Sequence, residues 1–184
     1  MNNTALYKEL AECNEKLRAY EEELAKLNQR VTSLKRDTIR DRTSNLYSNA
    51  YFYTRLVEEI LRSERYRHFL SLILIHLNPG SDQTTRQMTR ELRKIGAEIT
   101  ESLTRRTDIV ATYRQRQLIV MLPETDPHGA EVLVQRYQSS FPDNGRQLDY
   151  SVLTYPNDAT NIELMLARLQ ENSDRLIRDS ATNA

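Results

Sequence analysis

The stretch that most constrains the fold is residues 107–126, which read TDIVATYRQRQLIVMLPETD. Two short runs of mainly apolar residues flank a polar Arg-Gln-Arg-Gln segment, a pattern typical of a β-hairpin with a tight turn. A proline and an Asp-Pro pair follow, which indicate the end of a strand and the start of a helix. The sequence therefore predicts strand, turn, strand and helix in this order.

Elsewhere in residues 41–184, helical and strand patterns alternate. The first expected helix starts at Ser48 or Asn49 and ends near Arg67. Three further helices are expected at residues 84–103, 127–137 and 161–177. The expected strands are residues 70–77 (LSLILIHL, apolar enough for a central buried strand), 109–113, 118–122 and 149–154. This order predicts an α/β fold in which helices flank one central sheet.

Residues 3–41 carry an unbroken heptad pattern. Seam positions are occupied by Leu6, Leu10, Cys13, Leu17, Tyr20, Leu24, Leu27, Val31 and Leu34. A stripe this narrow predicts a coiled coil, and hence a homodimer through residues 1–40, with a second domain at 41–184. The flanking charges leave parallel and antiparallel pairing both open. The alternative is an amphipathic helix that packs on its own domain.

Composition excludes several classes of protein. The 26 basic and 26 acidic residues cancel, which argues against a general nucleic-acid binder. No apolar run reaches the roughly 18 residues that a membrane span needs, and the N-terminus lacks the apolar core of a secretory signal. With Cys13 as the one cysteine, no internal disulfide or paired-cysteine metal site is expected. These observations predict a cytoplasmic protein.

Two segments resemble the GGDEF family, the diguanylate cyclase domains of bacteria. Residues 107–126 resemble its signature hairpin. Near residue 41, the family pattern D-x-L-T-G-L-x-N-R-x-x-F is matched in register by Asp41, Ser44, Leu46, Tyr47, Asn49 and Phe52, with departures at Thr43 and Asn45. The resemblance extends to about residue 178. It implies a GGDEF-type central sheet flanked by helices, here preceded by a long N-terminal coiled-coil helix.

The residues that the family uses for catalysis are replaced. The signature positions hold Arg114, Gln115, Arg116, Gln117 and Leu118. The family places metal ligands at the end of the first central strand and in the signature. This chain has His76 and Asn78 at the first of these places, and Arg116 and Gln117 at the second. Neutral or cationic groups are poor Mg²⁺ ligands. The guanine-binding segment after that strand is also short, reading PGSDQTTRQMT. We therefore predict no enzyme activity, no catalytic residue, no metal and no cofactor.

The resemblance also implies a product site for cyclic di-GMP. The family's R-x-x-D motif ends five residues before the signature, as Arg105 and Asp108 do here, and Arg136 falls where the family has a further arginine. The family binds the ligand as a stacked dimer that bridges two surfaces. Independently, a forked arginine suits the O6/N7 edge of guanine, a carboxylate suits N1–H and N2–H₂, and a guanidinium suits phosphate.

Structural roles are the alternatives for these residues. Asp108 could cap or end the preceding helix, Arg105 could pair with Glu101, and His76 could be a core residue. The sequence predicts an inactive GGDEF-domain protein that acts as a cyclic di-GMP receptor and signals through contact with an unidentified protein partner. The alternative function is a nucleotide-independent dimeric scaffold or localisation protein.

Overall fold

The chain divides into two units, residues 1–38 and 39–184. The computed structural model describes residues 14, 16–18, 20–24, 26, 39–78, 84–103, 105–141 and 148–182. The division falls two residues before the predicted boundary. The described residues between 14 and 26 are helical, and the rest of the predicted coiled coil lies outside the described residues.

The second unit has the predicted order of elements. The helices are α2 (Asn49–Tyr66), α3 (Thr85–Ser102), α4 (Pro127–Ser140) and α5 (Ile162–Thr182), and the strands are β1 (Leu70–Leu77), β2 (Ile109–Thr112), β3 (Gln117–Pro123) and β4 (Leu148–Tyr155). The cap expected at Ser48 or Asn49 forms at Ser48, whose hydroxyl accepts from Tyr51 N at the start of α2. At the start of α4, the Asp126 side chain accepts from Gly129 N.

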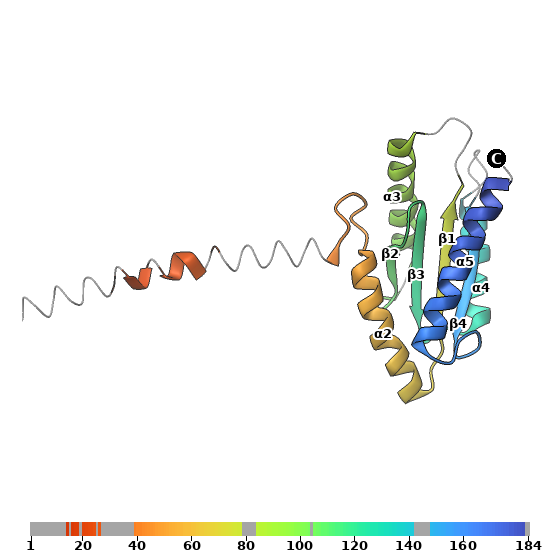
Figure 1. Ribbon diagram of the computed structural model, residues 1–184, viewed down its shortest axis with the longest axis horizontal. Coiled ribbons are helices and arrows are strands. Elements are labelled where there is room, and N and C mark those ends of the chain that lie inside the picture. Colours follow the sequence, from red (N-terminus) through yellow and green to blue (C-terminus); the bar gives the residue numbers. More distant parts are fainter. Residues whose placement is uncertain are drawn as a thin grey trace, which may run out of the picture. The chain divides into compact units, whose positions relative to one another are not determined.

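The four strands form one sheet in the order β2-β3-β1-β4, with every neighbouring pair antiparallel (Figure 1). In this register His76 on β1 lies opposite Gln117 on β3 and opposite Asp149 on β4. The chain thus brings His76, at the family's metal-ligand position, and the signature hairpin to the same end of the sheet.

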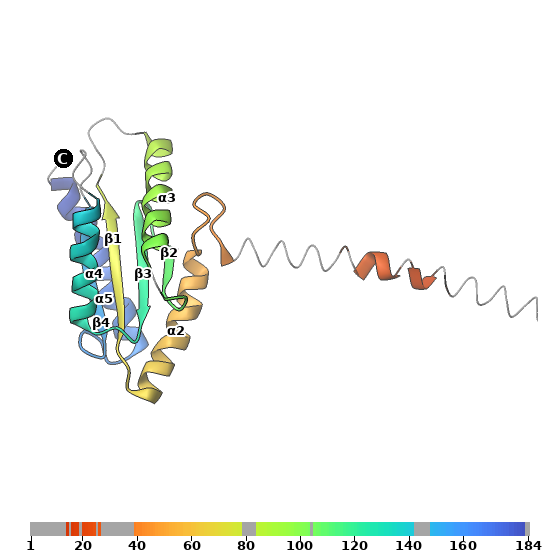
Figure 2. The same cartoon turned by 180° about the vertical axis from the view of Figure 1, so that it is seen from behind.

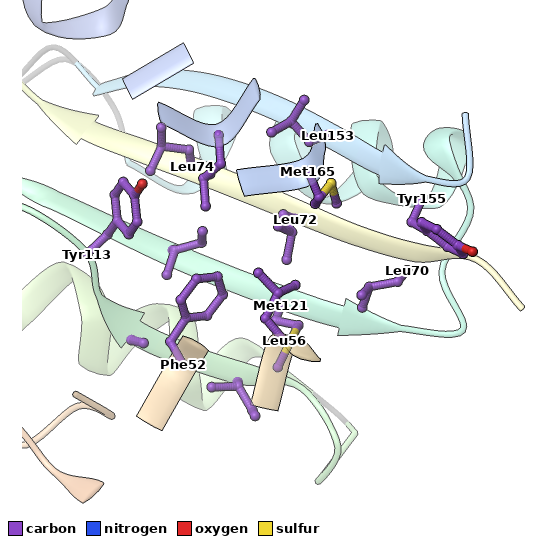
Figure 3. Close-up of a cluster of buried hydrophobic side chains, with 14 of the residues drawn as sticks. Phe52, Leu56, Leu70, Leu72, Leu74, Tyr113, Met121, Leu153, Tyr155 and Met165 are labelled. Carbon is purple, nitrogen blue, oxygen red and sulfur yellow. The ribbon is translucent and has the colours of Figure 1, made fainter. Parts of the chain in front are cut away.

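Helices cover both faces of the sheet. Helices α2 and α5 pack on one face, where Phe52, Leu56 and Met165 join strand residues in a buried cluster (Figure 3). Helices α3 and α4 pack on the other face with Ile99, Tyr137 and their neighbours (Figure 2). Because β1 is covered on both sides, all eight of its residues are buried, as its continuous apolar run predicts.

None of the helices described here is long and apolar enough to cross a membrane.

Candidate functional site

The R-x-x-D motif borders a pocket at the end of α3. The cavity is about 260 Å³, and its lining combines three guanidinium groups, one carboxylate, one phenol ring and three less polar side chains: Arg40, Tyr47, Thr100, Leu103, Arg105, Arg106, Asp108 and Val110. Arg105 and Asp108 therefore lie on one surface, as their spacing predicted. A turn holds them there, because Asp108 N donates to the carbonyl of Arg105 at 3.3 Å.

Asp108 contributes a carboxylate oxygen that has no partner. Its Oδ1 atom is buried and accepts no hydrogen bond within the described part of the chain. Burial raises the pKa of the Asp108 carboxyl, and the nearby Arg105 charge opposes this shift. A buried acceptor without a donor is costly, so this oxygen can accept hydrogen bonds from a molecule that enters the pocket.

The structural alternatives for the motif do not form. Helix α3 ends at the cap residue Leu103, so Asp108 lies beyond its end rather than capping it. Among the described residues, no ion pair links Arg105 to Glu101, and both Arg105 and Arg106 are exposed. Both guanidinium groups can therefore reach an anion in the pocket.

Arg136, the third predicted ligand residue, is not part of the pocket lining. It is an exposed residue on α4 whose Nη2 donates to the carbonyl of Ser102 at 3.1 Å, and its guanidinium lies 5.9 Å from the ring centroid of Tyr137. This bond attaches Arg136 to Ser102, at the end of α3, which precedes Arg105 by three residues in the chain. An exposed arginine can leave such a contact at small cost.

A short loop, residues 40–47, forms the wall opposite the motif. The Asp41 carboxylate accepts from Thr43 N, Ser44 N and Ser44 Oγ, which closes the loop. Tyr47 then attaches it to β2, because Tyr47 N donates to Val110 O and Thr112 N donates to Tyr47 O. Asp41, Ser44 and Tyr47, which match the family's opening pattern, therefore fix the loop that contributes to the pocket lining.

Close packing against α3 also fixes this loop. Leu46 is buried and lies against Gly96, where an added Cβ would overlap the leucine side chain. A side chain at this position would force Leu46 to shift, so glycine suits this close approach of loop and helix. Arg40 and Tyr47 were not among the predicted site residues: Tyr47 matches the opening pattern and Arg40 directly precedes it, but neither position indicated ligand binding.

The signature hairpin has a different environment. Its turn closes with Gln117 N donating to Arg114 O at 3.0 Å, and Arg116 adopts φ 64°, a conformation that favours glycine. Gln117 is completely buried and exchanges two hydrogen bonds with Ser173 of α5: Nε2 donates to the Ser173 carbonyl at 3.2 Å, and Ser173 Oγ donates to Oε1 at 2.7 Å.

A second contact joins the same two elements. Arg114 Nη1 donates to Asp174 Oδ1 at 2.6 Å and to Ser173 Oγ at 3.2 Å. The ion pair is half-exposed and stabilises little by itself. Together with the buried pair of Gln117 and Ser173, it anchors α5 on the hairpin, so two signature positions here serve packing.

His76 and Asn78 stand where the resemblance to the GGDEF family places metal ligands. His76 is 2% exposed, and neither ring nitrogen has a hydrogen-bond partner among the residues that the structure describes; Asn78 donates to Asp149 at 2.8 Å. Burial lowers the pKa of His76, the Asp149 carboxylate opposes this shift, and Arg116 adds to it, so the neutral form of the ring is favoured. No group of three or more His, Cys, Asp or Glu side chains suited to a metal occurs within the described ranges.

Solved GGDEF domains are similar to this structure. The coiled coil and GGDEF domain of DgcB from Caulobacter crescentus, in complex with c-di-GMP, has a TM-score of 0.66 and 11% identity, over 77% of this chain and 82% of that one. A microbial GGDEF domain studied for its interaction with cyclic di-GMP has a TM-score of 0.63 and 9% identity, over 82% of this chain and 95% of that one.

A further similar structure spans nearly the whole sequence. The diguanylate cyclase SiaD from Pseudomonas aeruginosa, in complex with its activator SiaC, has a TM-score of 0.62 and 17% identity, over 98% of this chain and 72% of that one. No protein-family model matches the chain, and no curated protein does. With its four-stranded antiparallel sheet and flanking helices, the domain at residues 39–184 has the fold of the GGDEF diguanylate cyclase domains.

Proposed function

We propose that this protein is a catalytically inactive GGDEF-fold protein that binds cyclic di-GMP at the R-x-x-D pocket and signals through contact with another protein. The observation that carries the proposal is the buried, unpartnered Oδ1 of Asp108 in a pocket whose other charged groups are arginines. The N1–H and N2–H₂ edge of guanine supplies the donors that this oxygen lacks.

Charge in and around the pocket suits the ligand. Arg40, Arg105 and Arg106 face a single carboxylate, so the lining has a net charge of about +2, which complements a dianion. In the proposed complex, Arg105 donates hydrogen bonds to the Hoogsteen edge of one guanine. Arg106 binds a phosphate group. Arg136 exchanges its bond to Ser102 for a second base or phosphate.

Titration calorimetry with cyclic di-GMP tests the proposal directly. We expect saturable binding by the full-length protein, together with bound ligand after purification from cells that contain the dinucleotide. Absence of heat and of saturation at 100 micromolar ligand would contradict the receptor function. The nucleotide-independent scaffold would then be the remaining function for this fold.

The protein should make no cyclic di-GMP from GTP with Mg²⁺ or Mn²⁺. His76, Asn78, Arg116 and Gln117 offer no paired carboxylates for the metal ions that neutralise the transferring phosphoryl group. Chromatographic detection of product measures this, with an active diguanylate cyclase as the positive control. Turnover above the blank would contradict it. A single Gln117→Glu change should leave the protein inactive, because the other losses remain.

The N-terminal helix should make the protein a dimer. The seam residues that the structure describes, Leu17, Tyr20 and Leu24, are 56–64% exposed, so they are free to face a partner helix. Burying nine seam residues per chain stabilises association by several kcal/mol, at about 1 kcal/mol for each large side chain after costs. We expect a dimer in sedimentation at tens of micromolar.

Charged seam variants supply the control for this association. Leu17→Asp together with Leu24→Asp should yield a monomer, because two carboxylates would be buried in the seam. Glu22→Ala, off the seam, should remain dimeric. A wild-type monomer would show that the heptad serves another purpose, such as packing on the protein's own domain.

A further inference from the structure

Three planar groups are stacked at the edge of the pocket. The rings of Tyr47 and Tyr51 are 4.7 Å apart at 20°, and the guanidinium of Arg40 lies 4.2 Å from the centroid of the Tyr47 ring. Both neighbours are within 5 Å of one ring, and each face of a ring accommodates one planar group at that distance. Arg40 and Tyr51 therefore occupy opposite faces, in the order Tyr51, Tyr47, Arg40.

Hydrogen bonds hold this stack in place. Arg40 Nη1 donates to the carbonyl of Asn45 at 2.9 Å, and Arg40 forms an antiparallel bridge with Tyr47. Tyr47 in turn bridges to Ala111 of β2, while Tyr51 belongs to α2. The guanidinium is thus fixed in orientation before any ligand arrives, which lowers the entropy that binding costs.

The stack ends at the pocket. Arg40 and Tyr47 line it, and Tyr51 does not, so Arg40 is the last layer of the stack and borders the cavity. Guanidinium planes are surfaces on which unpaired bases stack, since they are flat, cationic and weakly hydrated. Asp108, which suits the hydrogen-bonding edge of guanine, lines the same cavity.

We propose that one guanine base of the ligand stacks on Arg40, as the fourth layer after Tyr51, Tyr47 and Arg40, while Asp108 holds the edge of that base. This assignment rests on the proposed binding of cyclic di-GMP and adds two residues to its site. Asp108 then selects the base, and the Arg40 plane supplies affinity. The role of Arg40 depends on its flat shape as well as its charge.

Calorimetry with cyclic di-GMP on Arg40→Lys separates shape from charge. Lysine keeps the positive charge and loses the plane. Because a stacked base contributes on the order of tenfold or more to affinity, we expect both Arg40→Lys and Arg40→Ala to weaken binding by about tenfold or more. Tyr47→Phe keeps the ring and should bind within about twofold of wild type.

Arg86→Ala is the matched control. Arg86 is exposed on the first turn of α3, and about 21 Å of helix separates it from Thr100 at the pocket. It should bind like wild type.

If Arg40→Lys binds like wild type while Arg105→Ala is weakened, the stacking role is wrong and the receptor function stands. If Arg40→Ala is weakened and Arg40→Lys is not, Arg40 acts only as a charge, which also overturns the stack. No binding by wild type overturns both proposals.

Discussion

Replacing Arg105 by alanine weakens cyclic di-GMP binding by at least roughly 30-fold, because removing one charged partner of a buried ligand contact typically costs about 2 to 5 kcal/mol. Arg105 is exposed at the mouth of the pocket and lies near the Asp108 carboxyl, whose charge it stabilises. Its loss removes both a guanine contact and that stabilisation. Calorimetry on the full-length variant measures the change.

The control for this variant removes the same charge elsewhere. Arg86→Ala, on the same helix as the pocket's Thr100, should bind within about twofold of wild type, and so should Arg116→Ala at the signature turn. Equal binding by Arg105→Ala and wild type would place the ligand at another site. Unchanged thermal unfolding of each variant excludes misfolding as the cause of any loss.

The companion change Asp108→Asn should have opposite effects on binding and stability. The N–H donors of guanine lose the carboxylate that accepts from them, so we expect binding to weaken by about as much as in Arg105→Ala. The free protein gains about 1 kcal/mol of stability at neutral pH, because the change removes a partly buried carboxylate, one oxygen of which accepts no hydrogen bond from the described residues. Denaturant unfolding without ligand measures this gain, and a loss of stability would contradict the account of Asp108.

The sign of the pH dependence follows from the raised pKa of Asp108. A carboxyl with a raised pKa in the folded state favours folding below the ordinary aspartate pKa, and that contribution is lost as pH rises through the raised value. The stability gained by Asp108→Asn is therefore present at neutral pH and vanishes in acid. Ligand binding to the wild type needs the ionised form, so affinity falls as pH decreases through the raised pKa.

Gln117→Glu, which restores an acidic letter of the signature, should destabilise the fold by about 3 kcal/mol or more. Gln117 is 0% exposed, and its amide Nε2 donates to the carbonyl oxygen of Ser173. An ionised carboxylate would place an acceptor against that carbonyl and bury an unpaired charge. Urea denaturation at neutral pH measures the loss.

Gln115→Glu supplies the matched control for this change. Gln115 is the exposed neighbour in the same turn, so the identical chemical change should shift stability by less than about 0.5 kcal/mol. The destabilisation by Gln117→Glu should diminish in acid, because a protonated carboxyl group can donate to Ser173 as the amide does. A stable, well-folded Gln117→Glu protein at neutral pH would show that the hairpin does not anchor α5.

Local sequence patterns predicted most of the elements. The hairpin was expected at residues 109–113 and 118–122 and is found at 109–112 and 117–123, and the helix expected at 84–103 is Thr85–Ser102. Turn residues and capping side chains act within four or five residues, so they can be read along the chain. The last helix runs beyond residue 177 to Thr182, and Ser180 in these last turns is buried.

The pocket could be predicted only in part. Arg105 and Asp108 are three residues apart, so the turn between them brings them together. Arg136 was expected beside them, yet its guanidinium binds the end of α3 outside the lining. Arg40 and Tyr47 come from more than 55 residues away, and no local pattern connects them with the motif.

By itself the sequence determined the alternation of helices and strands, the β-hairpin and the loss of acidic side chains at the signature, because each depends on residue type and short-range geometry. Only the tertiary structure decided that all strand pairs are antiparallel and that Gln117 forms hydrogen bonds with Ser173 of α5. It also decided that Arg40 and Tyr47 line the same pocket as Asp108. These contacts join distant residues, and they depend on how each element packs on the sheet.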